Sequence, residues 1–459
     1  LAHYLKINEY IYPNNIFITP GSNNTIEFSG SSAYNLPSSI SNPFENLVIS
    51  GSGTKTLSEA TVITKRLLIQ PNATLQVGIR DITVNSSSLS SVSVLGSFLD
   101  NSDTGFNNLR NVTIESTGVF ASANASNYLI RGNITNNGVF SLTGSGILTL
   151  QNDVLGFFSN GVSPVVVNKQ TNIEGVRYLL GSNGFLFNNI VSIAGGASLL
   201  NNCAGGVVSI VGSLVGASAT SSFSSNGAGR HTRYYGSVIP MSTGVLNVSA
   251  TGNTFEYARN GAQTVENTTY YNLVVSGGAA KTSQSGAIVL GNCSIVGSNT
   301  QLNLGLIAVN PTIDIANNFI IGNGARFGFT GTQAGRLIVR GDLVGNTSNS
   351  TISLGGSNLQ HQLFFYGANN ELTSLTNSQL VTSAIVNFVG NNQTIPNLSY
   401  PNLVLSTTGS PNTKTINSNA SNARVYGNLS LYNSLLNIGN NVFIFNGATS
   451  TTLGKAFSA

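Results

Sequence analysis

The sequence predicts an all-β protein, a right-handed parallel β-helix built from degenerate repeats and running as one continuous segment over residues 1–459. A single phrase is written three times, as "PFENLVIS", "TYYNLVVS" and "SYPNLVLS", which indicates a repeated structural unit. The chain holds 51 Gly and no Trp, and only 7% of its residues are charged. Abundant β-branched residues punctuated by Gly and Asn favour short strands joined by turns. With 41% hydrophobic residues, the chain can form an extensive core.

Three long copies of the repeat define the expected elements in chain order. The first covers residues 26–78, from "IEFSG" through "PFENLVISGSGTKTL" to "ATLQVG". The second covers 255–305 and the third 386–439, and more degenerate relatives lie between them. Each copy holds four or five short strands separated by Gly, Asn and Ser turns. We expect the central strands to take equivalent positions in the coil, with their leucines inside: Leu47, Leu273 and Leu403.

A second motif marks a corner between strands. The chain reads "IRGNI" at 130–134, "VLGNC" at 289–293, "VRGDL" at 339–343 and "VYGNL" at 425–429. Strand alternation puts the first, third and fifth positions on one face, and a recurrent Gly at the third position indicates a bend. The fifth position is predicted to be a core position, held by Ile134, Cys293, Leu343 and Leu429. Cys293 is therefore expected to be a buried, inert thiol that is not linked to Cys203.

Two all-β architectures fit this spacing, a string of β-sandwiches or a β-helix with stacked coils. Sandwiches predict blocks of about 100 residues with linkers and clean alternation on strands that have one wet face. The sequence has no Pro-rich linkers and includes continuous apolar triplets such as "LVI" at 47–49. The β-helix is the favoured prediction, with about 20 to 25 residues per coil and right-handed crossovers.

The run "NLVISGSGTKTL", the "GNLxL" step and the closing "LNLG" or "LNIG" resemble the repetitive cell-surface proteins of Bacteroidetes. The resemblance covers the three long copies and much of the remainder. It implies a secreted β-helical adhesin of the kind exported by the type IX secretion system, a group that includes the adhesins of gliding motility. The chain opens at Leu1 and closes on "GATSTTLGKAFSA", which looks like a repeat unit cut partway through, so we expect the protein to continue beyond both ends.

An enzyme reading is the alternative, because β-helices also host polysaccharide lyases and hydrolases. Glycoside hydrolysis needs paired carboxylates, and the six Asp residues include no adjacent pair. Glu27 and Glu256 fall at matching repeat positions, which favours a structural role. The three His residues have no metal-ligand spacing. We therefore expect no catalytic residues, no metal and no cofactor.

The densest chemistry lies in "GAGRHTRYYG", which holds Arg230, His231, Arg233, Tyr234 and Tyr235. Two guanidinium groups beside two tyrosine rings could bind an acidic polysaccharide. The other interpretation of this stretch, and the favoured one, is a solvated loop or a structural corner.

Lysine recurs before Thr in each long copy, at Lys55, Lys281 and Lys414. We expect these three lysines to be solvated at an edge of the coil.

The predicted function is a structural rod or filament segment of an extracellular, cell-surface adhesin. Its partners would be surface glycans or the secretion and motility machinery. The net charge of +4 arises from 19 basic and 15 acidic residues without a basic run, which argues against nucleic acid as a partner. The sequence contains no uninterrupted run of about 18 apolar residues, so it predicts no membrane-spanning helix.

Overall fold

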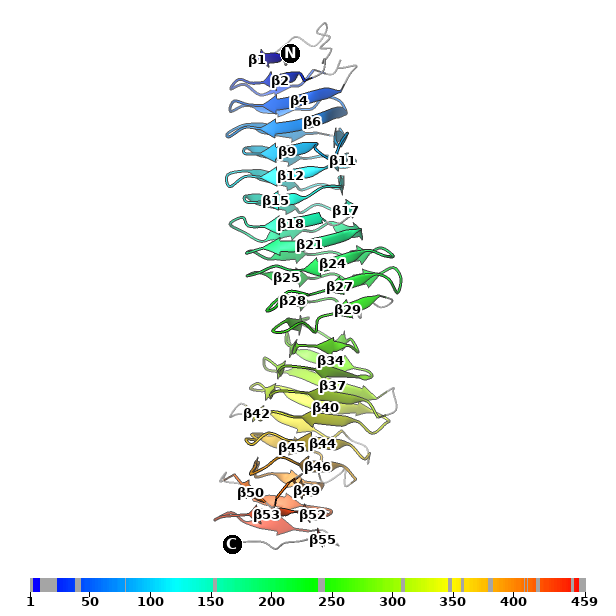
Figure 1. Ribbon diagram of the computed structural model, residues 1–459, viewed down its shortest axis with the longest axis vertical. Helices are drawn as coiled ribbons and strands as arrows, with labels where there is room; N and C mark the ends of the chain where they lie inside the picture. The colour runs from blue at the N-terminus through cyan, green and yellow to red at the C-terminus, as the bar shows by residue number, and fades with distance from the viewer. Residues whose placement is uncertain are drawn as a thin grey trace. The chain divides into compact units, whose positions relative to one another are not determined.

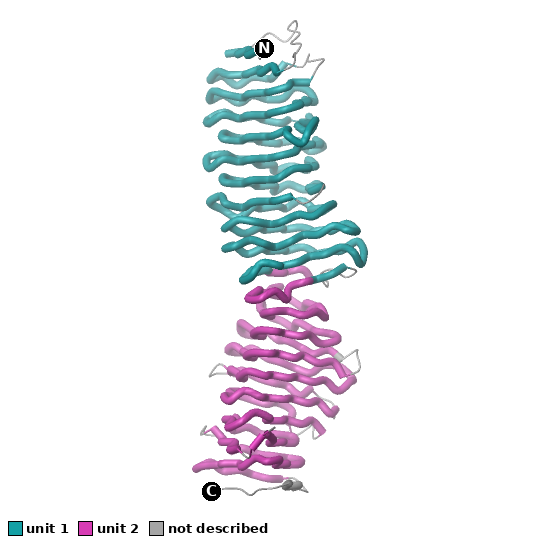
Figure 2. Tube along the Cα trace, in the orientation of Figure 1, with its two compact units in different colours: residues 1–232, 240–246 teal, residues 233–239, 247–459 magenta. Residues whose placement is uncertain are grey.

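The computed structural model describes residues 3–8, 23–37, 43–78, 80–151, 155–237, 244–306, 310–345, 349–355, 359–378, 383–407, 409–410, 412–417, 422–446 and 450–453. Over these ranges the protein is all-β with no helix, and its parallel strands stack as a β-solenoid of about 18 turns (Figure 1). The fold class expected from the sequence is thus confirmed. The chain divides into two compact units: unit 1 is 1–232 with 240–246, and unit 2 is 233–239 with 247–459 (Figure 2).

Unit 1 has three stacks of parallel strands, one strand from each turn. The first stack contains β1 (Tyr4–Ile7), β2 (Thr25–Phe28), β4 (Phe44–Ile49), β6 (Thr61–Ile69), β9 (Ser91–Val94), β12 (Asn111–Ile114), β15 (Ile134–Asn136), β18 (Leu155–Ser159), β21 (Val176–Gly181), β24 (Ser198–Asn201) and β27 (Ser222–Ser224). The second contains β8 (Ile82–Val84), β11 (Phe106–Leu109), β14 (Asn127–Ile130), β17 (Ile147–Gln151), β20 (Gln170–Glu174), β23 (Val191–Ile193) and β26 (Leu214–Gly216). The third contains β3 (Tyr34–Asn35), β5 (Thr54–Thr56), β7 (Thr74–Val77), β10 (Ser97–Asp100), β13 (Val119–Ser122), β16 (Val139–Leu142), β19 (Val165–Val167), β22 (Phe185–Phe187) and β25 (Val207–Ile210).

The long strand β6 joins the first two stacks of unit 1, because its first residues pair with β8 and its last with β9. The boundary between the units falls within β28 (His231–Tyr234) and β29 (Val245–Asn247).

Unit 2 is also built from parallel stacks. One contains β30 (Thr254–Tyr257), β33 (Asn272–Val275), β36 (Cys293–Ile295), β39 (Phe319–Ile321) and β42 (Leu343–Gly345). The next contains β31 (Gln263–Val265), β34 (Ala279–Ser283), β37 (Thr300–Leu306), β40 (Arg326–Gly331), β43 (Thr351–Ser353) and β45 (Ser374–Thr376). The longest contains β32 (Thr269–Tyr270), β35 (Gly286–Val289), β38 (Thr312–Ile315), β41 (Arg336–Val339), β44 (Gln362–Phe365), β46 (Ile385–Phe388), β49 (Asn402–Ser406), β52 (Leu429–Tyr432) and β55 (Ser450–Leu453). Two short stacks follow, β47 (Thr394–Ile395) with β50 (Asn412–Ile416) and β53 (Ser434–Asn437), and β48 (Ser399–Tyr400) with β51 (Ala423–Val425) and β54 (Phe443–Phe445).

The core of each unit consists of the inward positions of these strands, which alternate with half-buried outward ones. Equivalent inward residues lie above one another in adjacent turns. Phe98, Phe120 and Phe140 of β10, β13 and β16 form such a column, with ring centroids 4.4 and 5.2 Å apart. The column buries three aromatic rings and links three consecutive turns.

The repeated leucines Leu47, Leu273 and Leu403 are all fully buried, in β4, β33 and β49. The expectation that their strands occupy equivalent positions in the coil is wrong for the second and third copies. Within unit 2, β33 belongs to the stack that begins with β30, and β49 belongs to the stack that begins with β32. The two copies share the way their strand is flanked. β33 lies between β30 and β36, and β49 lies between β46 and β52. A turn of a solenoid contacts only its neighbours, so the same phrase can fold on either sheet.

The glycine motif lies at a corner, immediately before a strand. Asn292 N–H donates to the side-chain oxygen of Asn272 one turn earlier, at 3.0 Å, and Asn318 N–H donates to that of Asn292 at 3.1 Å. A Cβ on Gly291 would lie 2.4 Å from this Asn272 oxygen, so the motif requires glycine here. The strand then begins with a buried residue, and the four predicted core positions are all buried: Ile134, Cys293, Leu343 and Leu429.

Candidate functional site

The predicted basic and aromatic cluster is divided by the boundary between the units, which falls between Thr232 and Arg233. In unit 1, Arg230 and His231 are both half-buried. The Arg230 guanidinium donates from Nη1 to the carbonyl oxygen of Cys203 at 3.3 Å. This half of the cluster is therefore tied to the turn that precedes it.

In unit 2, Arg233 and Tyr235 are half-buried, but Tyr234 is fully buried. Strand alternation turns Tyr234 inward, where its ring packs edge-on against Tyr257 at 6.2 Å. The expectation of two tyrosine rings available to a glycan is therefore wrong for Tyr234. Arg233 forms an ion pair with Glu256, with Nε and Oε2 2.7 Å apart. The hydrogen bond to Glu256 raises the pKa of Arg233.

The matched glutamates each link adjacent turns. Glu256 accepts a hydrogen bond at 2.6 Å from the hydroxyl of Ser276, the residue that follows β33. Glu27 accepts one at 2.5 Å from Ser50, which follows β4 in the first copy. Lys6 lies 2.9 Å from Glu27, in the place that Arg233 has beside Glu256. This geometry accounts for the Ser that ends the phrase in the first two copies.

The lysines Lys55, Lys281 and Lys414 are fully buried, so the prediction of solvated lysines is wrong. Each ammonium group is held by oxygen atoms at the turns. Lys55 Nζ donates to the carbonyl oxygens of Gly30 and Gly53 at 2.7 and 2.9 Å. Burial lowers the pKa of Lys55.

Lys281 and Lys414 repeat this arrangement in unit 2. Lys281 Nζ donates to the carbonyl oxygens of Arg259 and Gly261 at 2.7 and 3.0 Å, and also to that of Gly278. Lys414 Nζ donates to Gly390 O and, at 2.6 Å, to Gln393 Oε1. Burial lowers the pKa of each lysine to about 8.

Two further interior cations in unit 1 were missed by sequence reasoning. Lys169 Nζ donates to the carbonyl oxygens of Asn124 and Ser145 at 2.7 and 2.5 Å. Arg177 donates to Gly132 O at 2.8 Å, and burial lowers its pKa to about 10. Both lie outside the three long copies, so no recurrence marked them. Arg177 takes an inward position of β21, whereas Lys169 lies in the turn between β19 and β20.

An interior carboxylate completes the polar core of unit 1. Asp100, at the end of β10, is fully buried. It accepts hydrogen bonds from the Tyr128 hydroxyl at 2.5 Å and from the Asn107 amide at 2.7 Å. These contacts connect β10 with β11 and β14, so Asp100 serves the packing between turns.

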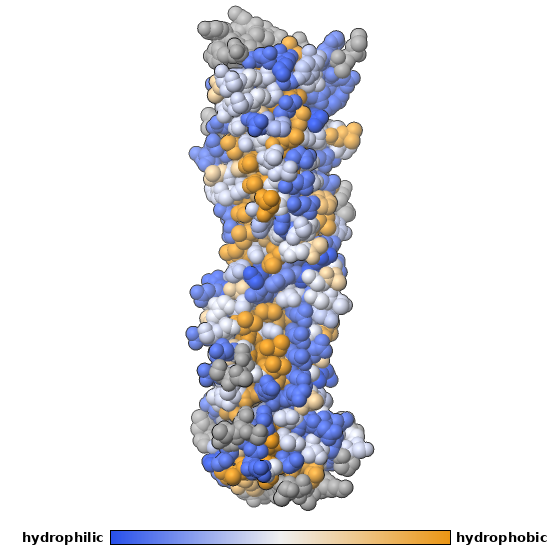
Figure 3. Space-filling view, turned by 90° about the vertical axis from the view of Figure 1, so that its left-hand side faces the viewer, coloured by the Kyte–Doolittle hydropathy of each residue, from blue (hydrophilic) through white to orange (hydrophobic). Residues whose placement is uncertain are grey.

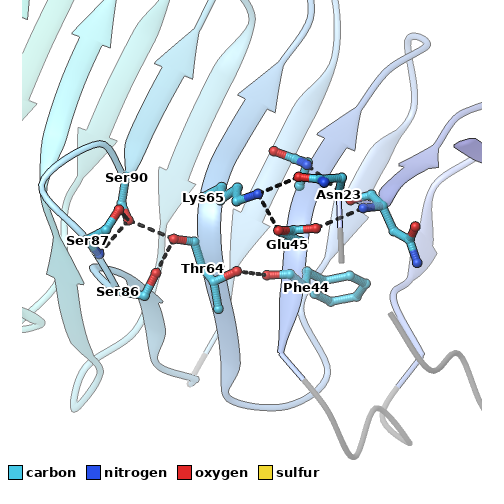
Figure 4. A network of polar contacts seen from close by, with 10 residues as sticks. Asn23, Phe44, Glu45, Thr64, Lys65, Ser86, Ser87 and Ser90 are labelled. Atoms are coloured by element: carbon cyan, nitrogen blue, oxygen red, sulfur yellow. Dashed lines mark hydrogen bonds and ion pairs between the residues drawn. The ribbon is translucent and has the colours of Figure 1, made fainter. Parts of the chain in front are cut away.

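Polar contacts also tie the outer corner beside β4 and β6 (Figure 4). Lys65 Nζ contacts Asn23 Oδ1 at 2.8 Å and forms an ion pair with Glu45. Ser90 Oγ donates to the carbonyl oxygen of Thr64 at 2.7 Å, which extends the network to a third turn. The network therefore links successive turns at the surface of unit 1.

Several of the remaining acidic residues form ion pairs and hydrogen bonds at corners of the described turns. In the ranges described above, no three His, Cys, Asp or Glu side chains gather in a group suited to a metal ion. Asp314 forms an ion pair with Arg340 at 2.8 Å, and Asp342 accepts the backbone N–H of Asn369 at 3.0 Å in a corner. Asp153 lies outside the described residues. Cys203 and Cys293 are both free and buried, and burial raises the pKa of the Cys293 thiol to about 12.

The outer surface combines hydrophobic and hydrophilic rows. On the side seen in Figure 3, hydrophobic residues gather along both units between hydrophilic ones. Exposed apolar residues include Val139 of β16 and Ile288 of β35. Unit 2 also has a polar hollow of about 360 Å³ on the outer side of β37, β40 and β43, with Arg326 at its wall. No helix that could span a membrane occurs in the described parts of the chain.

Comparisons with known proteins identify no relative: no protein-family model, no curated protein and no solved structure matches this chain.

Proposed function

We propose that this chain is a structural segment of an extracellular cell-surface adhesin, and that it works by holding a shape on which binding sites are presented. The observation behind this proposal is the use made of the recurrent residues. The Glu–Ser pairs, the buried lysines and the Asn–Gly corners all join one turn to the next. A motif whose residues serve only to stack turns is typical of a scaffold.

The sequence resemblance to Bacteroidetes surface proteins supports the adhesin part of the proposal. Carbohydrate-active catalysis is the competing function. It would require paired carboxylates in one groove, and the carboxylates of Glu27, Glu256 and Asp100 are instead engaged with side chains of adjacent turns.

A deletion of one complete turn tests the scaffold function. Val191 pairs with Leu214, so removal of residues 191–213 joins two positions that are already in register. The chain should be displayed on a cell surface between a membrane anchor and a terminal epitope. We expect the deletion variant to remain displayed, resistant to protease and cooperative in thermal unfolding, because a new pair of matching turns is formed.

The matched control removes residues 191–202, which is about half a turn and puts the later strands out of register. It should be degraded or lose display. Equal loss of display in both variants would contradict the scaffold proposal. The wild-type chain should also release no sugar from a panel of acidic and neutral polysaccharides; release of product would favour the enzyme.

A further inference from the structure

The polar hollow of unit 2 has a floor made by two small residues in one outward row. Asn303, Gly328 and Ser353 are paired in register on β37, β40 and β43. A Cβ on Gly328 would lie 3.0 Å from both Asn303 Oδ1 and Gln301 Nε2. The absence of a side chain at Gly328 thus leaves room for the ends of the Asn303 and Gln301 side chains from the adjacent strand, which lie over the floor of the hollow at this position.

A buried imidazole lines the hollow with one ring nitrogen unused. His361 is 1% exposed, and its ring stacks on Phe329 with centroids 4.3 Å apart. Its Nδ1 accepts the backbone N–H of Gly335 at 3.1 Å. Burial lowers the pKa of His361 to about 4, so the ring is neutral at neutral pH. A neutral ring that accepts at Nδ1 carries its proton on Nε2, and this N–H has no acceptor among the residues that the structure describes.

The other groups around the hollow offer both donors and acceptors. Arg326 is the charged residue of the lining, and it is exposed and has no ion-pair partner in the described ranges. Gln301 donates from Nε2 to Asn303 at 2.6 Å, which leaves its Oε1 as an acceptor. Asn377 donates from Nδ2 to Gly355 O at 2.6 Å, which leaves its Oδ1 as an acceptor. Ser353 also lines the hollow, and its hydroxyl group can both donate and accept a hydrogen bond.

This combination defines the ligand chemistry. A guanidinium group binds a carboxylate through two parallel hydrogen bonds. The free amide oxygens of Gln301 and Asn377 need donors, which sulfate does not have at neutral pH and which sugar hydroxyls supply. The volume of about 360 Å³ lies near the lower end of the range for small-molecule sites, about 300–1,000 Å³.

We propose that the hollow binds one acidic sugar unit of a polysaccharide, with its carboxylate on Arg326 and its ring hydroxyls on His361 Nε2, Ser353, Gln301 and Asn377. The site goes beyond the scaffold function and does not depend on it. It differs from the cluster around Arg233, which already serves the Glu256 ion pair.

Titration calorimetry with a glucuronate-containing disaccharide tests the proposal. The wild-type chain should bind the disaccharide with one site, and Arg326→Ala should weaken binding at least tenfold because the carboxylate loses its partner. Gly328→Val should abolish binding by filling the floor, since a β-branched residue suits a strand. Arg336→Ala is the matched control, because Arg336 is an exposed arginine of the same unit that does not line the hollow. It should leave binding unchanged.

Three results would overturn the proposal. These are no binding by the wild-type chain, equal binding by wild type and Arg326→Ala, and displacement of the disaccharide by an equal concentration of sulfate. A matching neutral disaccharide should bind at least tenfold more weakly than the glucuronate compound. Unchanged thermal unfolding of Arg326→Ala separates a lost contact from a lost fold, and none of these outcomes bears on the turn-deletion test of the scaffold.

Discussion

The interior lysines donate hydrogen bonds to backbone carbonyl groups that are buried at the turns. Where the chain leaves one strand for the next, some carbonyl groups point inward and find no backbone N–H. A buried carbonyl without a partner costs about 1–3 kcal/mol. Lys169 supplies donors to two such groups, Asn124 O and Ser145 O, which lie one turn apart. The two carbonyl dipoles in turn stabilise the ammonium group and offset part of the hydration free energy that it loses on burial.

Replacement of this lysine should show its contribution to stability. We expect Lys169→Met to lower the free energy of unfolding of unit 1 by about 1–3 kcal/mol at pH 7, because two buried carbonyls lose their donor. The control is Lys65→Met in the same unit, since the Lys65 side chain is 51% exposed and surface ion pairs such as the one with Glu45 contribute little to stability. Denaturant titration measures both, and equal effects of the two changes would contradict the assignment.

The same lysine predicts a pH dependence with a definite sign. Burial lowers the pKa of Lys169 from 10.5 to about 8, so between these values the unfolded chain binds a proton that the folded chain has released. The contribution of Lys169 to stability therefore rises as pH increases above about 8, and comparison with a variant that lacks this lysine isolates it from other groups. Lys169→Met should show a shallower rise between pH 7.5 and 9.5. The upper limit avoids the ionisation of unfolded tyrosines, which acts in the opposite direction. A slope identical to that of wild type would contradict the predicted shift.

Residue-scale prediction failed at the lysines for an identifiable reason. Lysine is usually exposed in folded proteins. The low charge of the chain strengthened the expectation that its few lysines lie at the surface. The local pattern pointed the other way: in "TKTL" at 54–57, Leu57 is an inward residue, so alternation also puts Lys55 inward. The hydrogen-bond needs of the turns are not visible in the sequence. This is also why Lys169 and Arg177 were missed.

At the scale of the strand and its corner, the sequence predicted most of what the structure shows. Alternation and the Gly–Asn step placed Cys293 and its counterparts at buried positions that open a strand. What was not predictable is the sheet on which a copy folds. Because each strand is specified by the turns before and after it, the phrase around Leu273 and that around Leu403 fold on different stacks with similar neighbours.

The corner at Gly291 leaves no room for a Cβ atom, which a substitution can test. In Gly291→Ala the new Cβ would meet Asn272 Oδ1 at 2.4 Å and Tyr271 O at 2.9 Å, so a side chain and the backbone must shift. We expect a loss of about 1–3 kcal/mol in the stability of unit 2, typical of a steric insertion at a packed position. Gly409→Ala is the control in the same unit, because a Cβ there meets no atom within 4 Å. Thermal unfolding that ranks Gly409→Ala as the more damaging change would contradict this account of the motif.

At the scale of the whole molecule, the sequence predicted a β-solenoid built from repeats, and each of the two compact units stacks parallel turns. The division falls at residues where no long copy of the repeat lies, between 232 and 247. The binding cluster predicted from composition lies across this division, and its members are largely committed to the packing of their own unit. The hollow beside Arg326 depends on a missing side chain in one row, which requires the register of three strands and so lay beyond sequence reasoning.

The central claim is that cohesion resides in contacts between adjacent turns, so that the chain can serve as a scaffold. Stretching a single molecule from its two ends tests this most directly. With about 25 residues per turn, each turn that detaches should lengthen the chain by about 85 Å. The account predicts a series of such steps, reversed on relaxation, because each turn is bound only to its neighbours. Featureless extension without steps, or a single event that releases all turns together, would contradict it.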